Sequence, residues 1–137
     1  MKSTVPTDPA SDATRANSPL RVLLVEDNLD AADLMVLMLA REGMDAVAVG
    51  SVKEAIAEYE RQRPHAIVSD LMLPDESGGV LAEFVRRKDD QETHLLALSG
   101  RHDGEQIAKA AGFDRFILKP VEVSQLVEEL RAGRKPR

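Results

Sequence analysis

Residues 66–70 have the sequence Ala66-Ile67-Val68-Ser69-Asp70, an apolar run that ends on an acidic side chain. The same pattern occurs earlier in the chain, where Val22-Leu23-Leu24-Val25 is followed by Glu26-Asp27-Asn28. Short apolar runs of this kind are typical of strands that are buried on both faces of a parallel sheet. We therefore expect two inner strands, each of which delivers carboxylates at its carboxyl end.

Three further segments predict strands, at residues 46–49, 95–98 and 113–118. Helical spacing of apolar residues or good helix formers predicts helices at 31–39, 51–59, around 81–85, at 103–110 and at 123–130. Strands that alternate with helices at intervals of roughly 20 to 30 residues form βα repeats. The sequence therefore predicts an α/β fold, a doubly wound five-stranded parallel sheet of order 2-1-3-4-5 with flavodoxin-like topology.

Two helix starts have a capping signal. Ser51 and Glu54 have the spacing of a capping box, which predicts that the helix over 51–59 begins there. Asp103 is the expected N-cap of the helix over 103–110, with Ile107 and Ala110 on its inner face.

The composition indicates how many domains the chain forms and whether it enters a membrane. The chain has 137 residues, of which 43% are hydrophobic and 31% charged, a balance typical of one globular domain. Residues 1–19 have almost no apolar side chains and predict a mobile tail, followed by one domain over 20–131 and a basic tail over 132–137. No apolar run approaches the ~18 residues of a membrane span, so we expect a cytoplasmic protein without a membrane partner.

Charge and cysteine content exclude several function classes. The net charge of −6 disfavours a surface for nucleic-acid backbones. The chain has no cysteine, which excludes disulfides, thiolate metal sites and cysteine nucleophiles. His65 and His94 fall at the starts of their strands and are expected to be structural, and His102 is expected to be a solvated loop residue.

Polar side chains follow the predicted strands at the edge where ligands bind in such a sheet. They are Glu26 and Asp27 after the first strand, Asp70 after the third, Ser99 after the fourth and Lys119 after the fifth. Because strands one and three are neighbours, three carboxylates converge. Two carboxylates about 4 Å apart repel by roughly 4 kcal/mol at an effective dielectric near 20, so a cation is needed.

Oxygen ligands without His or Cys suit Mg²⁺, with Mn²⁺ as an alternative. One Mg²⁺ and Lys119 would balance the charges of Glu26, Asp27 and Asp70. A carboxylate beside a metal, a lysine and a hydroxyl is suited to phosphoryl transfer onto that carboxylate. We therefore predict that Asp70 is the phosphoacceptor and that Ser99 hydrogen bonds the attached phosphoryl group.

Four segments together resemble the receiver domain of two-component response regulators: residues 24–28 (LVEDN), 69–78 (SDLMLPDESG), 96–100 (LALSG) and 116–120 (FILKP). The resemblance covers about residues 20–130. It implies that Asp70 takes a phosphoryl group from a phosphohistidine of a sensor histidine kinase or histidine phosphotransfer protein.

The resemblance also assigns roles to the other residues. It implies that Asp27 binds Mg²⁺ directly, that Glu26 assists through water, and that Met72 contributes its backbone carbonyl. Ser99 and Phe116 match the family's switch pair, and Pro120 matches the position of its cis peptide. Because no output domain follows the last predicted helix, we expect a stand-alone receiver, with only intrinsic self-phosphorylation and self-dephosphorylation. We expect it to contact a downstream protein through the face formed by residues 103–110, 113–118 and 123–130. A homodimer is a further expected form, which the sequence does not decide.

Three positions depart from the family pattern. Glu26 replaces the commoner Asp, Phe116 lacks the hydroxyl of the more usual Tyr, and Val121 follows Lys119-Pro120 where Phe is frequent. The last feature, together with Ala111-Gly112-Phe113-Asp114, is similar to receivers attached to hybrid histidine kinases.

Two other classes compete with this interpretation. A haloacid-dehalogenase-like, Mg²⁺-dependent phosphatase also uses an aspartyl phosphate, but it requires a second Asp two residues after the nucleophile, where this chain has Met72. A flavodoxin-like binding module requires a Gly, Ser or Thr-rich phosphate loop after the first strand, where Glu26 and Asp27 would repel the phosphate.

Overall fold

The structure is a computed structural model that describes residues 19–88 and 90–133. The expected tail over 1–19 lies outside these residues except for Pro19. Of the expected basic tail over 132–137, the structure describes Ala132, the last residue of a helix, and Gly133; the rest lies outside the described residues.

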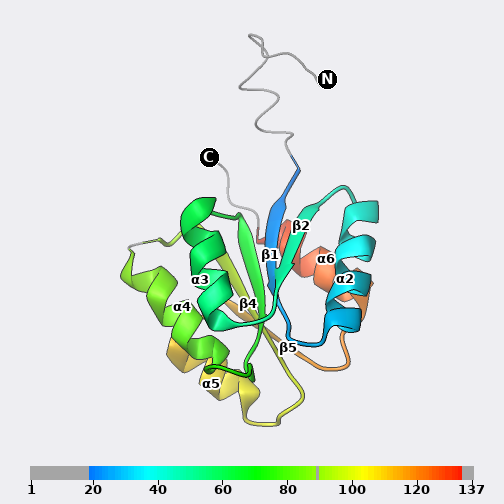
Figure 1. Ribbon diagram of the computed structural model, residues 1–137. Helices are drawn as coiled ribbons and strands as arrows, with labels where there is room; N and C mark the ends of the chain where they lie inside the picture. Colours follow the sequence, from blue (N-terminus) through cyan, green and yellow to red (C-terminus); the bar gives the residue numbers. More distant parts are fainter. Residues whose placement is uncertain (1–18, 89, 134–137) are drawn as a thin grey trace.

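Five strands alternate with five helices in the described residues (Figure 1). The strands are β1 (Arg21–Val25), β2 (Asp45–Val49), β3 (Ala66–Asp70), β4 (His94–Ser99) and β5 (Arg115–Leu118). The helices are α2 (Leu29–Arg41), α3 (Val52–Arg61), α4 (Gly78–Arg87), α5 (Gly104–Ala111) and α6 (Val123–Ala132). All strand pairs are parallel and the sheet order is β2-β1-β3-β4-β5, which confirms the predicted topology.

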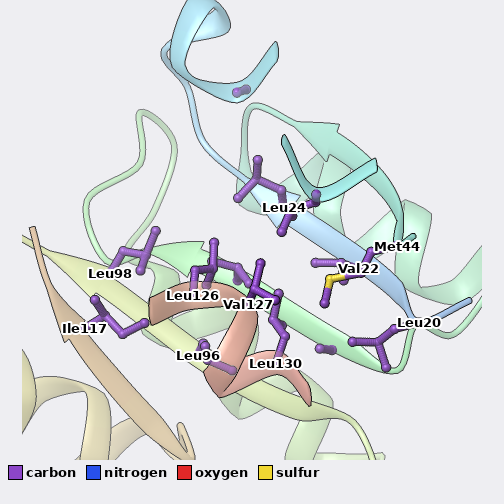
Figure 2. Close-up of a cluster of buried hydrophobic side chains, with 14 residues drawn as sticks. Leu20, Val22, Leu24, Met44, Leu96, Leu98, Ile117, Leu126, Val127 and Leu130 are labelled. Carbon is purple, nitrogen blue, oxygen red and sulfur yellow. The ribbon is translucent and has the colours of Figure 1, made fainter. Parts of the chain in front are cut away.

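Helices cover both faces of the sheet. Helices α2 and α6 lie on one face, and α3, α4 and α5 lie on the other (Figure 1). Alternate residues of β1 enter the two resulting cores, since Val22 and Leu24 pack toward α2 and α6 whereas Leu23 and Val25 pack toward α3 and α4. Figure 2 shows the first core, in which Leu96, Leu126 and other aliphatic side chains interlock. Each fully buried aliphatic side chain contributes about 1.5 to 3 kcal/mol to folding.

Helix α5 differs from the prediction. Ile107 is 38% exposed and Ala110 is also exposed, so the expected inner face was wrong. Gly104 and Ala108 face the core instead. Asp103 is the N-cap residue, as predicted, but its side chain makes no cap hydrogen bond within the described residues and forms an ion pair with Arg101 instead.

The capping box at the start of α3 forms in part. Ser51 Oγ accepts a hydrogen bond from the backbone N–H of Glu54 at 3.1 Å. The carboxylate of Glu54 accepts from the N–H of Gly50 rather than that of Ser51. The helix therefore begins where it was predicted to begin, with the second bond shifted by one residue.

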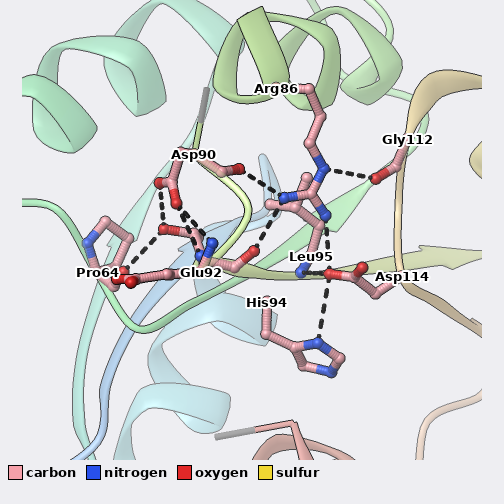
Figure 3. A network of polar contacts seen from close by, with 9 residues as sticks. Pro64, Arg86, Asp90, Glu92, His94, Leu95, Gly112 and Asp114 are labelled. Carbon is pink, nitrogen blue, oxygen red and sulfur yellow. Dashed lines mark hydrogen bonds and ion pairs between the residues drawn. The ribbon is translucent and has the colours of Figure 1, made fainter. Parts of the chain in front are cut away.

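A polar network closes the amino edge of β4 (Figure 3). The Asp114 carboxylate accepts from the Leu95 N–H at 2.8 Å and from Arg86 at 2.9 Å. His94 Nδ1 lies 3.4 Å from the same carboxylate. The two buried histidines, His94 and His65, therefore lie at the edge opposite the predicted site; the Nδ1 of His65 accepts from the Arg21 N–H.

Candidate functional site

The carboxyl ends of β1 and β3 bring three acidic side chains together. Val25 pairs with Ser69 in the sheet register, so Glu26 and Asp27 follow one strand beside the end of the other, at Asp70. Carboxylate oxygens of these three acidic residues all lie within 4.8 Å of one another. The convergence predicted from strand order is therefore present.

Lys119 brings a positive charge to this cluster. Its Nζ lies 2.8 Å from Asp70 Oδ1 and 3.6 Å from Glu26 Oε1. The Lys119–Pro120 peptide bond is cis, and the Lys119 N–H donates to the carbonyl of Ser99. Burial opposes the charge of the lysine, but the neighbouring carboxylates of Asp70 and Glu26 raise its pKa above the usual value.

Asp70 is 5% exposed, and its neighbours do not offset the cost of burying its negative charge. Burial raises its pKa to about 7; Lys119 opposes this rise and the Glu26 carboxylate adds to it. Glu26 shifts the other way. Burial acts against its charge, but the Asn28 N–H, which donates to its carboxylate at 3.0 Å, together with Asp70 and Lys119, lowers its pKa.

The donor set fits a hard divalent cation. All three side chains offer carboxylate oxygens, Asp27 is exposed to solvent, and one Lys leaves an excess of negative charge. Mg²⁺ keeps several waters and uses one or two carboxylates, which suits a site that opens to solvent on one side. Glu26, Asp27 and Asp70 could therefore hold Mg²⁺ or Mn²⁺.

The loop after Asp70 is held by two contacts that the sequence analysis did not identify. Asp75 accepts hydrogen bonds at 3.0 Å from the N–H groups of Val52 and Lys53, so it caps helix α3 from another loop. Gly78 begins α4, where a Cβ atom would lie 2.2 Å from the Asp70 carbonyl oxygen. The glycine was visible in the sequence, but the close approach that requires it was not.

Ser99 and Phe116 lie on the adjacent strands β4 and β5. Asp70 pairs with Leu98 in the register, which places Ser99 one residue beyond, and the Ser99 Oγ accepts from the Arg101 N–H at 3.1 Å. Phe116 is partly buried and packs against the core on the α3, α4 and α5 side. The Met72 side chain is 64% exposed, and His102 is exposed.

The chain matches the family model of the response regulator receiver domain over residues 22–131. It therefore belongs to the receiver domains of two-component response regulators, as its fold and site indicated. The haloacid-dehalogenase alternative is a different family, and Met72 occupies the position of the acid that it requires.

Similar proteins support this assignment. The chain is 30% identical to the sensory transduction protein RegX3 of Mycolicibacterium smegmatis, over 81% of this chain and 49% of that protein. It is 34% identical to the transcriptional regulatory protein TrcR of Mycobacterium tuberculosis, over 83% of this chain and 45% of that protein. The chain thus spans about half the length of these two relatives.

Solved structures agree with the fold. A response regulator receiver domain from Methylobacillus flagellatus aligns with a TM-score of 0.77 and 28% identity, over 85% of this chain and 100% of the other. In the described ranges, the helices are too short or too polar to cross a membrane.

Proposed function

We propose that this domain accepts a phosphoryl group on Asp70 from a phosphohistidine and passes the signal on through changed protein contacts. The observation that carries the proposal is the buried Asp70 carboxylate, 2.8 Å from Lys119 and within 4.8 Å of two further carboxylates, in a chain of the receiver family. A buried carboxylate with a raised pKa beside a specific charge partner is typical of a functional site.

In the proposed transfer, one carboxylate oxygen of Asp70 attacks phosphorus. The bond between phosphorus and the imidazole nitrogen breaks, and that nitrogen leaves with the electron pair. Lys119 Nζ stabilises negative charge on the transferred group, and the Ser99 hydroxyl donates a hydrogen bond to it. Asp27 and Asp70 would hold Mg²⁺, with Glu26 assisting through water and the Met72 carbonyl as a further ligand. When bound, Mg²⁺ neutralises charge on the phosphoryl oxygens.

The proposed partners are a sensor histidine kinase or a histidine phosphotransfer protein in the cytoplasm, and a downstream protein on the face formed by α5, β5 and α6. Ile107 and Leu118 support that face, because they are large apolar side chains that are 38% and 49% exposed on two of its elements.

The test is phosphorylation by a small donor. With acetyl phosphate and Mg²⁺, intact mass spectrometry should find one added phosphoryl group in the wild type and none in Asp70→Asn. Asp45→Asn is the matched control, because Asp45 is exposed at the start of β2, at the opposite edge of the sheet. Equal labelling of Asp70→Asn, or labelling that survives removal of divalent ions by EDTA, would refute the proposal.

A further inference from the structure

Gly104, the first residue of α5, lies against both residues of the proposed switch. A Cβ atom at this position would lie 2.7 Å from Cε1 and 2.9 Å from Cζ of Phe116, and 3.1 Å from Cβ of Ser99. Carbon atoms pack at about 3.5 to 4.0 Å, so the Phe116 ring occupies the space that any larger residue would fill.

The backbone at Gly104 does not itself call for glycine. Among the described glycines, Gly43 and Gly112 have positive φ angles and Gly104 does not. Alanine could adopt the backbone conformation at 104, and only the neighbouring side chains exclude its methyl group. The space beside the ring is therefore the reason for a glycine here.

We infer that Gly104 is a positioning residue of the switch. The space that its missing side chain leaves accommodates the Phe116 ring at the start of α5, close to Ser99. A shift of Ser99 toward a phosphoryl group therefore changes the packing of the ring and of α5 together. This inference rests on the proposed function in one respect, namely that Ser99 and Phe116 respond to phosphorylation.

Phe116 lacks the hydroxyl that the more usual tyrosine has, so the position of its ring depends on packing alone. A phenylalanine ring has no polar atom to fix its position, so its neighbours must do so. Phe116 packs against the core that contains Ala108 and Phe113, one residue within α5 and one shortly after it. Gly104 adds a contact between the ring and the start of the same helix, so a change in the packing of the ring can reach α5.

Thermal unfolding in two backgrounds tests the steric part. Where space allows, Gly→Ala stabilises a protein, because alanine loses less backbone entropy on folding. We expect Gly104→Ala to lower Tm in the wild type and not to lower it when Phe116→Ala has removed the ring. Gly100→Ala is the matched control, because its Cβ would meet nothing within 4 Å. An equal change of Tm for Gly104→Ala in both backgrounds would overturn the inference.

Fluorine NMR tests the coupling. The chain has three phenylalanines, so 4-fluorophenylalanine labelling gives three resonances that single Phe→Leu variants assign. Beryllofluoride with Mg²⁺ serves as the phosphoryl analogue. We expect it to shift the Phe116 resonance in the wild type and in Gly100→Ala, and to lose most of that shift in Gly104→Ala.

The outcomes separate the two claims. An unchanged Phe116 response in Gly104→Ala, beside a responsive wild type, would overturn the inference while leaving the proposed function intact. A wild type that does not respond to beryllofluoride with Mg²⁺ would contradict the proposed function, and the melting comparison would still decide whether Gly104 positions the ring.

Discussion

At the residue scale, two buried aspartates differ in how well their surroundings stabilise the negative charge. Asp90 is 4% exposed and accepts four hydrogen bonds, from the Tyr59 and Thr93 hydroxyls and from the N–H groups of Glu92 and Thr93. Burial works against its charge, yet these donors lower its pKa to about 2. Asp70 is equally buried, and the Lys119 Nζ group 2.8 Å from its Oδ1 does not outweigh burial and the Glu26 carboxylate, so its pKa rises to about 7. The carboxylate whose charge is less well stabilised is the one proposed to react.

Asp90 predicts a pH-dependent stability. Its folded pKa of about 2 lies below the ordinary 3.8, so its contribution is present above pH 3.8 and is lost as the pH falls toward 2. The difference corresponds to about 2 kcal/mol. We expect Asp90→Asn to lower the free energy of unfolding by that amount at pH 7 and by less near pH 3, as measured by urea denaturation. A deficit that does not shrink in acid would contradict this account, and exposed Asp45→Asn should show none.

At this scale the sequence predicts the residues that follow strands. Parallel strands have their carboxyl ends at one edge of the sheet, whatever conformation the loops adopt. The sequence therefore identified four site residues: Glu26, Asp27, Asp70 and Lys119. Asp90 could not be found in this way, because its partner Tyr59 lies in α3, in a distant part of the sequence. Such pairings depend on how helices pack, which spacing along the chain does not determine.

At the element scale, the loop after β3 is joined to the start of α3. Hydrogen bonds from the Val52 and Lys53 N–H groups lower the pKa of Asp75, which caps α3 together with Ser51. A helix start has N–H groups without partners in the helix, so it anchors a carboxylate well. The loop that bears Met72 is thereby fixed to a rigid element.

This contact predicts a local effect of Asp75→Ala. The amides of Val52 and Lys53 should exchange with solvent faster, because they lose their acceptor, and Tm should fall. Hydrogen exchange followed by NMR measures both amides. Glu76→Ala is the control, because Glu76 is the exposed neighbour and only its backbone N–H contacts Asp75. Unchanged exchange at Val52 and Lys53 in Asp75→Ala would show that the cap does not protect α3.

The elements themselves were largely predictable, and α5 shows where prediction fails. Continuous apolar runs identified the inner strands because both faces of this sheet are covered. Helix α5 has few apolar residues, so Ile107 was assigned to the core by default. In the structure that residue is exposed, and Gly104 and Ala108 face the core. The close approach of Gly104 to the Phe116 ring is a contact between elements that helical spacing does not reveal.

At the scale of the whole molecule, the strand order accumulates negative charge at one edge, and Mg²⁺ should relieve it. We expect about 10 mM Mg²⁺ to raise Tm, because an ion that binds only the folded state stabilises it, by about 2.7 kcal/mol when its concentration is 100 times its Kd. Differential scanning calorimetry measures the shift. Asp27→Asn should reduce the Mg²⁺ effect, and Asp45→Asn should retain it. A wild-type Tm that does not change with Mg²⁺ would argue against the metal site.

The central claim is that Asp70 forms an acyl phosphate, and reduction by borohydride tests it most directly. The wild type would be treated with acetyl phosphate and Mg²⁺, reduced, digested and sequenced by tandem mass spectrometry. Reduction of an aspartyl phosphate leaves homoserine at the modified position. The account predicts homoserine at position 70 and unmodified aspartate at position 27. Homoserine at another position, or a phosphoryl group recovered on Ser99, would contradict it.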